Sequence, residues 1–133
     1  MWMNDPIEPL LPAMREIANT QPPHPSHVLW LNWNGPAQRP DMAFSVEHRT
    51  YLALYCGLGN GVDEAQHVNW ATDHMKALES WSRGIQLADE NLARRPAKFV
   101  SDANMARLDQ ARAKYDQEGR FHPWMGRLPI QSS

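Results

Sequence analysis

The chain has 133 residues, a formal net charge of −2 and one cysteine, and these numbers limit the kinds of protein it can be. The length predicts one domain with a core of its own, and the near-neutral charge gives no electrostatic basis for binding nucleic acid or an anionic membrane. Cys56 has no disulfide partner, and no apolar run approaches the roughly 20 residues of a membrane helix. We therefore expect a cytoplasmic protein with a reduced thiol.

The first 25 residues predict a proline-rich leader that docks elsewhere. Three early prolines favour an extended or turning start. Residues 11–19 can form a short helix before a connector rich in proline. Trp2 and Met3 are then either disordered or packed onto a partner, and the main domain runs over residues 26–133.

Three short segments predict strands of one sheet. Residues 28–33 carry aromatic and branched side chains between turn residues, and residues 42–46 and 49–56 follow with similar character. Alternate side chains of the first strand are apolar on both faces, so we expect both faces of the sheet to be covered.

The second half of the chain predicts two helices. Residues 63–81 carry apolar side chains at helical spacing, and a strand at 85–88 follows. A second helix begins at Ser101, whose hydroxyl can accept from the first turn, and stops at Gly119. Strands and helices do not alternate regularly, which favours an α+β fold with an antiparallel sheet.

Most motifs for known chemistry are missing. The histidine pairs His24/His27 and His67/His74 lack the further ligands of a zinc site, so we expect no bound metal and assign these side chains to the surface. Cys56 lies on an apolar strand without a basic neighbour, as a structural thiol does. Arg94 and Arg95 are expected to contact a partner or to lie at the surface. The glycines from position 57 to 61 lack the spacing of a dinucleotide-binding turn.

One pattern near the end of the chain indicates a family. After the polar turn Asp89-Glu90-Asn91, the second helix carries a set of residues at characteristic spacing: Arg107, Leu108, Arg112, Tyr115, Asp116, Gly119 and Phe121. This pattern resembles the C-terminal end of FAD-linked oxidases of the vanillyl-alcohol oxidase / p-cresol methylhydroxylase superfamily, particularly the berberine-bridge-enzyme-like group. The resemblance covers about residues 26 to 128. Gln117 stands where the family has a proline, and Gln86-Leu87-Ala88 stands where it has Tyr-x-Asn.

The resemblance implies a site at a flavin ring. By analogy with the family, Asn91 would hydrogen-bond the ring, and Gln86, Asp89 and Phe121 would lie around the cofactor. The sheet would form the roof of a substrate pocket lined by Trp30, Trp33 and Tyr51. Tyr55 and His48 are the candidate catalytic residues, and Trp124 joins Phe121 as an anchor in the tail.

The family's FAD-binding domain has no counterpart in this sequence. The resemblance therefore implies the small subunit of a split FAD-dependent oxidoreductase, inactive alone, in which a larger partner chain holds most of the FAD. The reaction would be hydride transfer from a small organic substrate to the flavin. The departures from the family pattern favour an alternative, a non-catalytic binding or assembly scaffold. A truncated gene product without activity is a third possibility.

Overall fold

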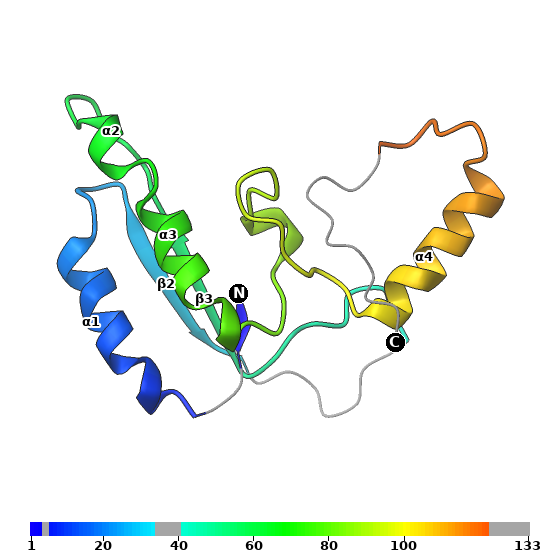
Figure 1. Cartoon of the computed structure of the whole chain (residues 1–133), viewed down its shortest axis with the longest axis horizontal. Helices are drawn as coiled ribbons and strands as arrows, with labels where there is room; N and C mark the ends of the chain where they lie inside the picture. Colours follow the sequence, from blue (N-terminus) through cyan, green and yellow to red (C-terminus); the bar gives the residue numbers. More distant parts are fainter. Residues whose placement is uncertain (4–5, 34–40, 123–133) are drawn as a thin grey trace.

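A computed structural model describes residues 1–3, 6–33 and 41–122 of the chain. The fold is α+β, as the sequence predicts, with a three-stranded antiparallel sheet and flanking helices. Figure 1 shows the sheet together with helices α1 and α3, while helix α4 stands at the opposite end of the molecule. Trp124 lies outside the described residues.

The sheet has the order β1-β3-β2, so the last strand in sequence lies at its centre. Strand β1 (Trp2–Met3) and strand β2 (His27–Asn32) both pair antiparallel to β3 (Thr50–Tyr55). The side chains of Met1, Trp2 and Met3 are all buried within the chain. The first residues therefore form part of the same sheet and core as the later strands.

Two helices cover one face of the sheet. Helix α1 (Leu11–Thr20) contributes Ile17 to the core and follows a 3-10 turn, η1 (Glu8–Leu10). Helix α3 (Trp70–Ala77) packs beside it, and the Trp70 indole donates to the Thr20 hydroxyl at 3.1 Å. The two helices bury the face of β3 that carries Leu52, which is fully buried. This layer holds the larger hydrophobic core.

The opposite face of the sheet is only partly covered. A small cluster of Trp2, Val46, Tyr51 and Ala53 is buried there. Along β2 and just beyond it, three large side chains on this face stay exposed: Leu29 (39%), Leu31 (38%) and Trp33 (41%). The expectation that both faces are covered is therefore wrong for β2, because no second layer lies over it in the described part of the chain.

Residues 42–46 form no strand, contrary to the sequence prediction. The Asn104 side-chain amide donates to the carbonyls of Met42 and Ala43, at 2.8 and 3.3 Å. The Ser45 hydroxyl accepts from the Ser101 amide at 3.0 Å. The Met42 and Ala43 carbonyls are therefore bonded to Asn104 of α4, and not to a neighbouring strand.

The predicted helix over 63–81 is broken into three pieces: α2 (Glu64–His67), α3 and the 3-10 turn η2 (Glu79–Trp81). Asp63 caps α2 by accepting from the Ala65 amide at 3.0 Å. At the break, the Arg94 guanidinium donates to the Val68 carbonyl at 3.1 Å and to the Asn69 side chain. A side chain from a distant loop therefore contacts the carbonyl that precedes α3.

The strand predicted at 85–88 is also absent. Gly84 alone forms a bridge with Trp2, and the Ile85 amide donates to the Lys98 carbonyl at 2.8 Å. The chain then turns through η3 (Leu87–Asp89), in which the Asp89 amide donates to the Gln86 carbonyl at 3.0 Å. Ile85 is buried, so its apolar character reflects core packing and not a strand.

Helix α4 (Asp102–Tyr115) has the predicted cap, because the Ser101 hydroxyl accepts from the Asn104 amide at 3.3 Å. Met105 is buried against the core, whereas Tyr115 is exposed, so only the first half of the helical face is covered. Gly119 follows the helix with φ of 64°, in the left-handed region expected of a stop. No helix within the described residues is long and apolar enough to cross a bilayer.

Candidate functional site

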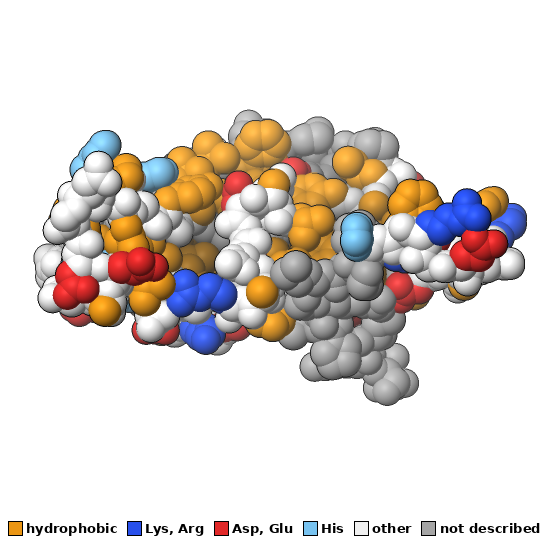
Figure 2. Space-filling model, turned by 90° about the horizontal axis from the view of Figure 1, so that it is seen from above, with side chains coloured by type: hydrophobic (Ala, Val, Ile, Leu, Met, Phe, Trp, Pro, Cys, Tyr) orange, Lys and Arg blue, Asp and Glu red, His pale blue; other side chains and the backbone are white. Residues whose placement is uncertain are grey.

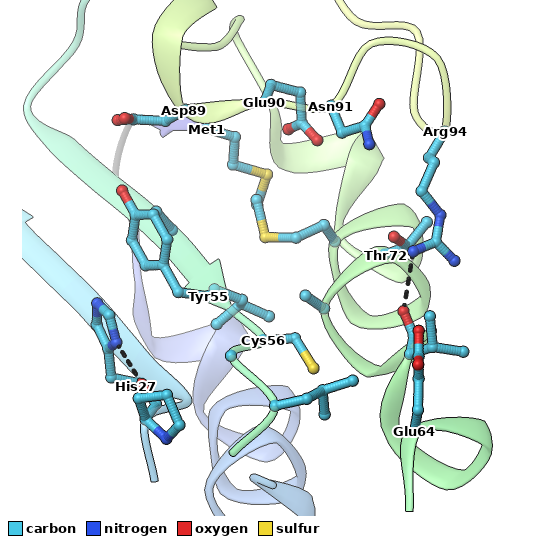
Figure 3. Close-up of a pocket in the computed structure, with 18 of the residues that line it drawn as sticks. Met1, His27, Tyr55, Cys56, Glu64, Thr72, Asp89, Glu90, Asn91 and Arg94 are labelled. Atoms are coloured by element: carbon cyan, nitrogen blue, oxygen red, sulfur yellow. Dashed lines mark hydrogen bonds between the residues drawn. The ribbon is translucent and has the colours of Figure 1, made fainter. Parts of the chain in front are cut away.

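A cavity of about 630 Å³ lies beside the edge of β3 (Figure 3). It exists because β1 is much shorter than β3. The Leu52 amide donates to the Met1 carbonyl at 2.9 Å, and no described strand continues along β3 beyond that contact. In an antiparallel sheet the backbone N–H and C=O of every second residue point to the same side of a strand. Leu54 is two residues after Leu52, so its N–H and C=O face the same edge of β3, which is open there. We call this space the β3-edge cavity.

One wall of the β3-edge cavity is apolar and the rim is polar. The apolar side chains come from α3, its preceding loop and the inner face of the sheet: Met1, Leu54, Val68, Ala71 and Met75. The polar side chains come from β2, β3 and the loop after η3: His27, Tyr51, Tyr55, Asp89, Glu90, Asn91 and Arg94, with Glu64 and Thr72 opposite. An apolar body with a few convergent polar groups is the usual form of a small-molecule site.

Two tyrosines of β3 meet Asp89 at the rim. The Tyr51 hydroxyl donates to Asp89 Oδ2 at 2.8 Å. Burial raises the pKa of Tyr51 well above its ordinary value, and the hydrogen bond and charge of Asp89 raise it further. Burial and then Asp89 also raise the pKa of Tyr55. Both phenols are neutral near pH 7, so both serve as hydrogen-bond donors or neutral acceptors and not as tyrosinate bases.

The loop carrying Asp89 and Glu90 is fixed by a buried arginine. Arg95 is only 3% exposed and forms ion pairs with both Glu79 and Glu90. Burial by itself lowers the pKa of Arg95, but the hydrogen bonds and charges of these two carboxylates raise it above the ordinary value. The expected partner or surface contact of Arg95 is therefore wrong: its charge is neutralised within the chain. Neighbouring Arg94 is bound to the loop before α3, as described above.

Asn91 lies on the cavity rim, but its carbonyl oxygen is used locally. Oδ1 accepts from the Ala93 amide at 3.2 Å, which closes the turn after η3. Such local capping is a common role for asparagine in turns. The Asn91 side chain therefore has its Nδ2 group left to donate to a ligand in the cavity.

The structure gathers only part of the predicted site. Tyr51, Tyr55, Asp89 and Asn91 line the β3-edge cavity, and the other predicted site residues do not: Trp30, Trp33, His48, Gln86 and Phe121. The register opposes Trp30 to Leu52 on the helix-covered face, whereas Trp33 packs against Trp2 on the other face with ring centroids 6.4 Å apart. Phe121 lies beyond the end of α4 and is 70% exposed.

His27 is exposed, as the sequence predicts for a surface histidine, but sequence reasoning did not place it beside the cavity. Its ring stacks on Tyr55, with centroids 4.6 Å apart and planes 16° apart. Its Nδ1 lies 3.0 Å from the Pro25 carbonyl oxygen. The register pairs His27 with Tyr55 across the two strands, so an accurate antiparallel register could have found this contact. Cys56 also lines the cavity, and its thiol donates to the His67 carbonyl at 3.3 Å.

Comparison with known proteins gives one informative similarity. The FAD-linked oxidoreductase nodO of Hypoxylon pulicicidum is 28% identical over 82 residues, which is 62% of this chain and 18% of that protein. The chain thus spans less than a fifth of the length of the curated relative that it matches. No protein-family model matches the chain, and no solved structure matches it. The similarity supports a distant relationship to a domain of FAD-linked oxidoreductases.

A metal site has no support within residues 1–3, 6–33 and 41–122. No group of three His, Cys, Asp or Glu side chains is placed there to hold an ion.

Proposed function

We propose that this chain is the small subunit of a split FAD-dependent oxidoreductase and forms the wall of the substrate pocket against the flavin ring. The similarity over 82 residues to an FAD-linked oxidoreductase is the observation that carries the proposal. In this proposal a larger partner chain binds most of the FAD, because the matched protein is several times longer than this chain.

In this proposal the β3-edge cavity would receive the ring end of a flavin. A flat ring system needs apolar contact on its face and hydrogen-bond groups along its edge. Leu54 and Met75 provide apolar contact, while the Leu54 backbone and the Asn91 amide provide groups for the ring's carbonyl and N–H positions. The glycines from position 57 to 61 lack the spacing of a dinucleotide-binding turn. In this proposal the partner binds the dinucleotide part of the cofactor.

When bound, the flavin would supply the hydride acceptor of an oxidation. The residues of this chain would orient the ring through Asn91, exclude water with the apolar wall and present Tyr51, Tyr55 and Asp89 to the substrate. Tyr51 and Tyr55 donate hydrogen bonds, so they can orient a carbonyl or hydroxyl oxygen during the reaction.

The test begins with purification of the tagged chain from its native cells. We expect a larger co-purifying chain and the absorbance bands of an oxidised flavin. In that complex Asn91→Ala should change the flavin spectrum or its rate of reduction, because the ring loses a hydrogen bond. Asn19→Ala, an exposed position in α1, is the matched control. A colourless eluate without a partner contradicts the proposal.

A second candidate function is a non-catalytic assembly scaffold that keeps this domain. The use of Asn91 Oδ1 in its own turn favours this reading, as does the lack of the family's Tyr-x-Asn and Asp-Pro residues. A purified complex that retains full activity after Asn91→Ala, Tyr55→Phe and His48→Ala would establish the scaffold role.

A further inference from the structure

We propose that His27 is the proton-accepting residue of the β3-edge cavity, and that the cavity binds ligands that present a hydrogen-bond donor, a hydroxyl or an ammonium group, in preference to carboxylates. The assignment of the binding site stands on the geometry of this chain. Only the use of the proton acceptor in an oxidation rests on the proposed function.

The surroundings of His27 fix which ring nitrogen carries the proton. A carbonyl oxygen can only accept, so Nδ1, at 3.0 Å from the Pro25 oxygen, must be the protonated nitrogen. In the neutral ring the other nitrogen, Nε2, then carries a lone pair. Figure 3 shows the ring beside Tyr55, with Nδ1 bonded to Pro25 and Nε2 on the far side of the ring from that contact.

The ring plane of His27 is also held. The imidazole stacks on the Tyr55 phenol, 4.6 Å between centroids and 16° from parallel. A hydrogen bond in the ring plane and a stacked face together restrict rotation about both side-chain torsions. His27 lines the rim of the cavity with an exposed side chain, so its Nε2 lone pair is held in a defined position that solvent and a ligand can reach, as a proton acceptor requires.

The charges around the cavity select the ligand class. Three carboxylates line it, Glu64, Asp89 and Glu90. Arg95 is paired with Glu79 and Glu90. Arg94 lines the cavity and keeps its positive charge, because its partners on Val68 and Asn69 are neutral groups. The three carboxylates still outnumber this one lining cation. The surplus of negative charge disfavours an anionic ligand and favours a donor or a cation. A ligand hydroxyl or ammonium can donate to His27 Nε2, while the apolar wall takes its carbon skeleton.

With the proposed flavin, the chemistry of an alcohol substrate balances. Nε2 of His27 would take the O–H proton, the flavin would supply the acceptor for the hydride of the adjacent C–H, and the C–O single bond would become a C=O bond. Positioned acid–base groups of this type typically contribute about 10²–10⁴-fold to the rate.

The first experiment uses the full chain alone, labelled with ¹⁵N and studied by NMR. Long-range ¹H–¹⁵N spectra at alkaline pH should show that Nδ1 of His27 is protonated and that Nε2 is not. Benzyl alcohol and benzylamine should then shift the His27 Nε2 resonance, and benzoate at equal concentration should not. His27→Gln should weaken benzyl alcohol binding by about 3- to 10-fold, the loss of one hydrogen bond, and His122→Gln should leave it unchanged.

Three results would overturn the proposal: a His27 protonated at Nε2 alone, benzoate binding as tightly as the alcohol and amine, or unaltered alcohol binding by His27→Gln. None of these readouts requires flavin or a partner. If they hold while no flavoprotein complex is found, the donor-binding site stands and the proposed function fails.

In a flavin-loaded complex the same variant has a second readout. His27→Gln should lower kcat by about 10²–10⁴-fold, whereas His122→Gln should leave kcat unchanged. An unchanged kcat in a folded His27→Gln complex would contradict the proton-acceptor role.

Discussion

At the scale of single residues, the contact between Tyr51 and Asp89 connects the centre of the sheet to the cavity rim. The phenol is buried on β3 and donates to the carboxylate of Asp89, the last residue of η3. The same contact fixes the position of Asp89 and keeps Tyr51 protonated. A change at Tyr51 should therefore be visible both in stability and in its dependence on pH.

We predict that Tyr51→Phe lowers the free energy of unfolding by about 0.5–1.5 kcal/mol near pH 7, through loss of one hydrogen bond. The ordinary pKa of the group is 10.0 and the folded pKa is higher, so above pH 10 the folded state binds more protons than the unfolded state. The free energy of unfolding of the wild type should therefore fall as pH rises above about 10. That of Tyr51→Phe should fall less steeply. Urea unfolding at several pH values measures this. Tyr115→Phe, which removes a hydroxyl at an exposed position, is the control, and identical curves for wild type and Tyr51→Phe would exclude the effect.

At the scale of elements, Gly84 allows three segments to meet. It forms the bridge to Trp2, and its φ of +150° is rarely adopted by other residues. A Cβ at this position would lie 2.6 Å from the Val46 Cβ and 2.9 Å from the Lys98 carbonyl oxygen. β1, the segment before β3 and the segment before α4 can therefore approach each other only around a glycine.

We predict that Gly84→Ala destabilises the chain by about 2–5 kcal/mol, the sum of backbone strain and overpacking. Gly61→Ala is the matched control, since Gly61 also has positive φ but nothing within 4 Å of the added carbon. The control should cost about 1–2 kcal/mol from backbone strain alone. Urea unfolding followed by tryptophan fluorescence compares the two. Equal losses for both variants would show that the close approach at Gly84 does not matter.

Elements with local determinants could be predicted from the sequence, and those set by distant contacts could not. The cap at Ser101, the strand around Trp30 and the α+β class follow from neighbouring residues. The break before α3 depends on Arg94, far along the chain, and the failed strand at 85–88 depends on Trp2 and Lys98. Tyr51, Tyr55 and Asp89 were placed near a site by the resemblance to FAD-linked oxidases, whereas placing His27 beside Tyr55 required the strand register.

At the scale of the whole molecule, the sheet is covered unequally. The helices α1 and α3 bury one face, whereas Leu29, Leu31 and Trp33 stay exposed on the other. β2 is also an edge strand, which leaves backbone groups along it without a neighbouring strand in the described residues. Figure 2 shows hydrophobic side chains across the central part of one face of the molecule, with charged side chains at both of its ends and along its lower edge.

We predict that the isolated chain self-associates through this side of the sheet and that Leu31→Lys weakens the association, because a charge on an exposed strand disfavours pairing. Leu87→Lys is the control, since Leu87 is equally exposed but lies in η3. Sedimentation velocity over a range of concentrations measures the effect. If both variants weaken self-association equally, the change in net charge alone would explain the effect.

The position of Trp2 has a consequence for how the protein is made. Its amide donates to the Gly84 carbonyl at 2.7 Å, and its carbonyl accepts from the Arg83 amide at 2.8 Å. Trp2 is synthesised before Arg83 and Gly84, so its hydrogen bonds to them cannot form until the chain has been extended past Gly84. Such long-range pairing slows folding, and a chaperone that binds exposed aromatic residues could bind Trp2 during that interval.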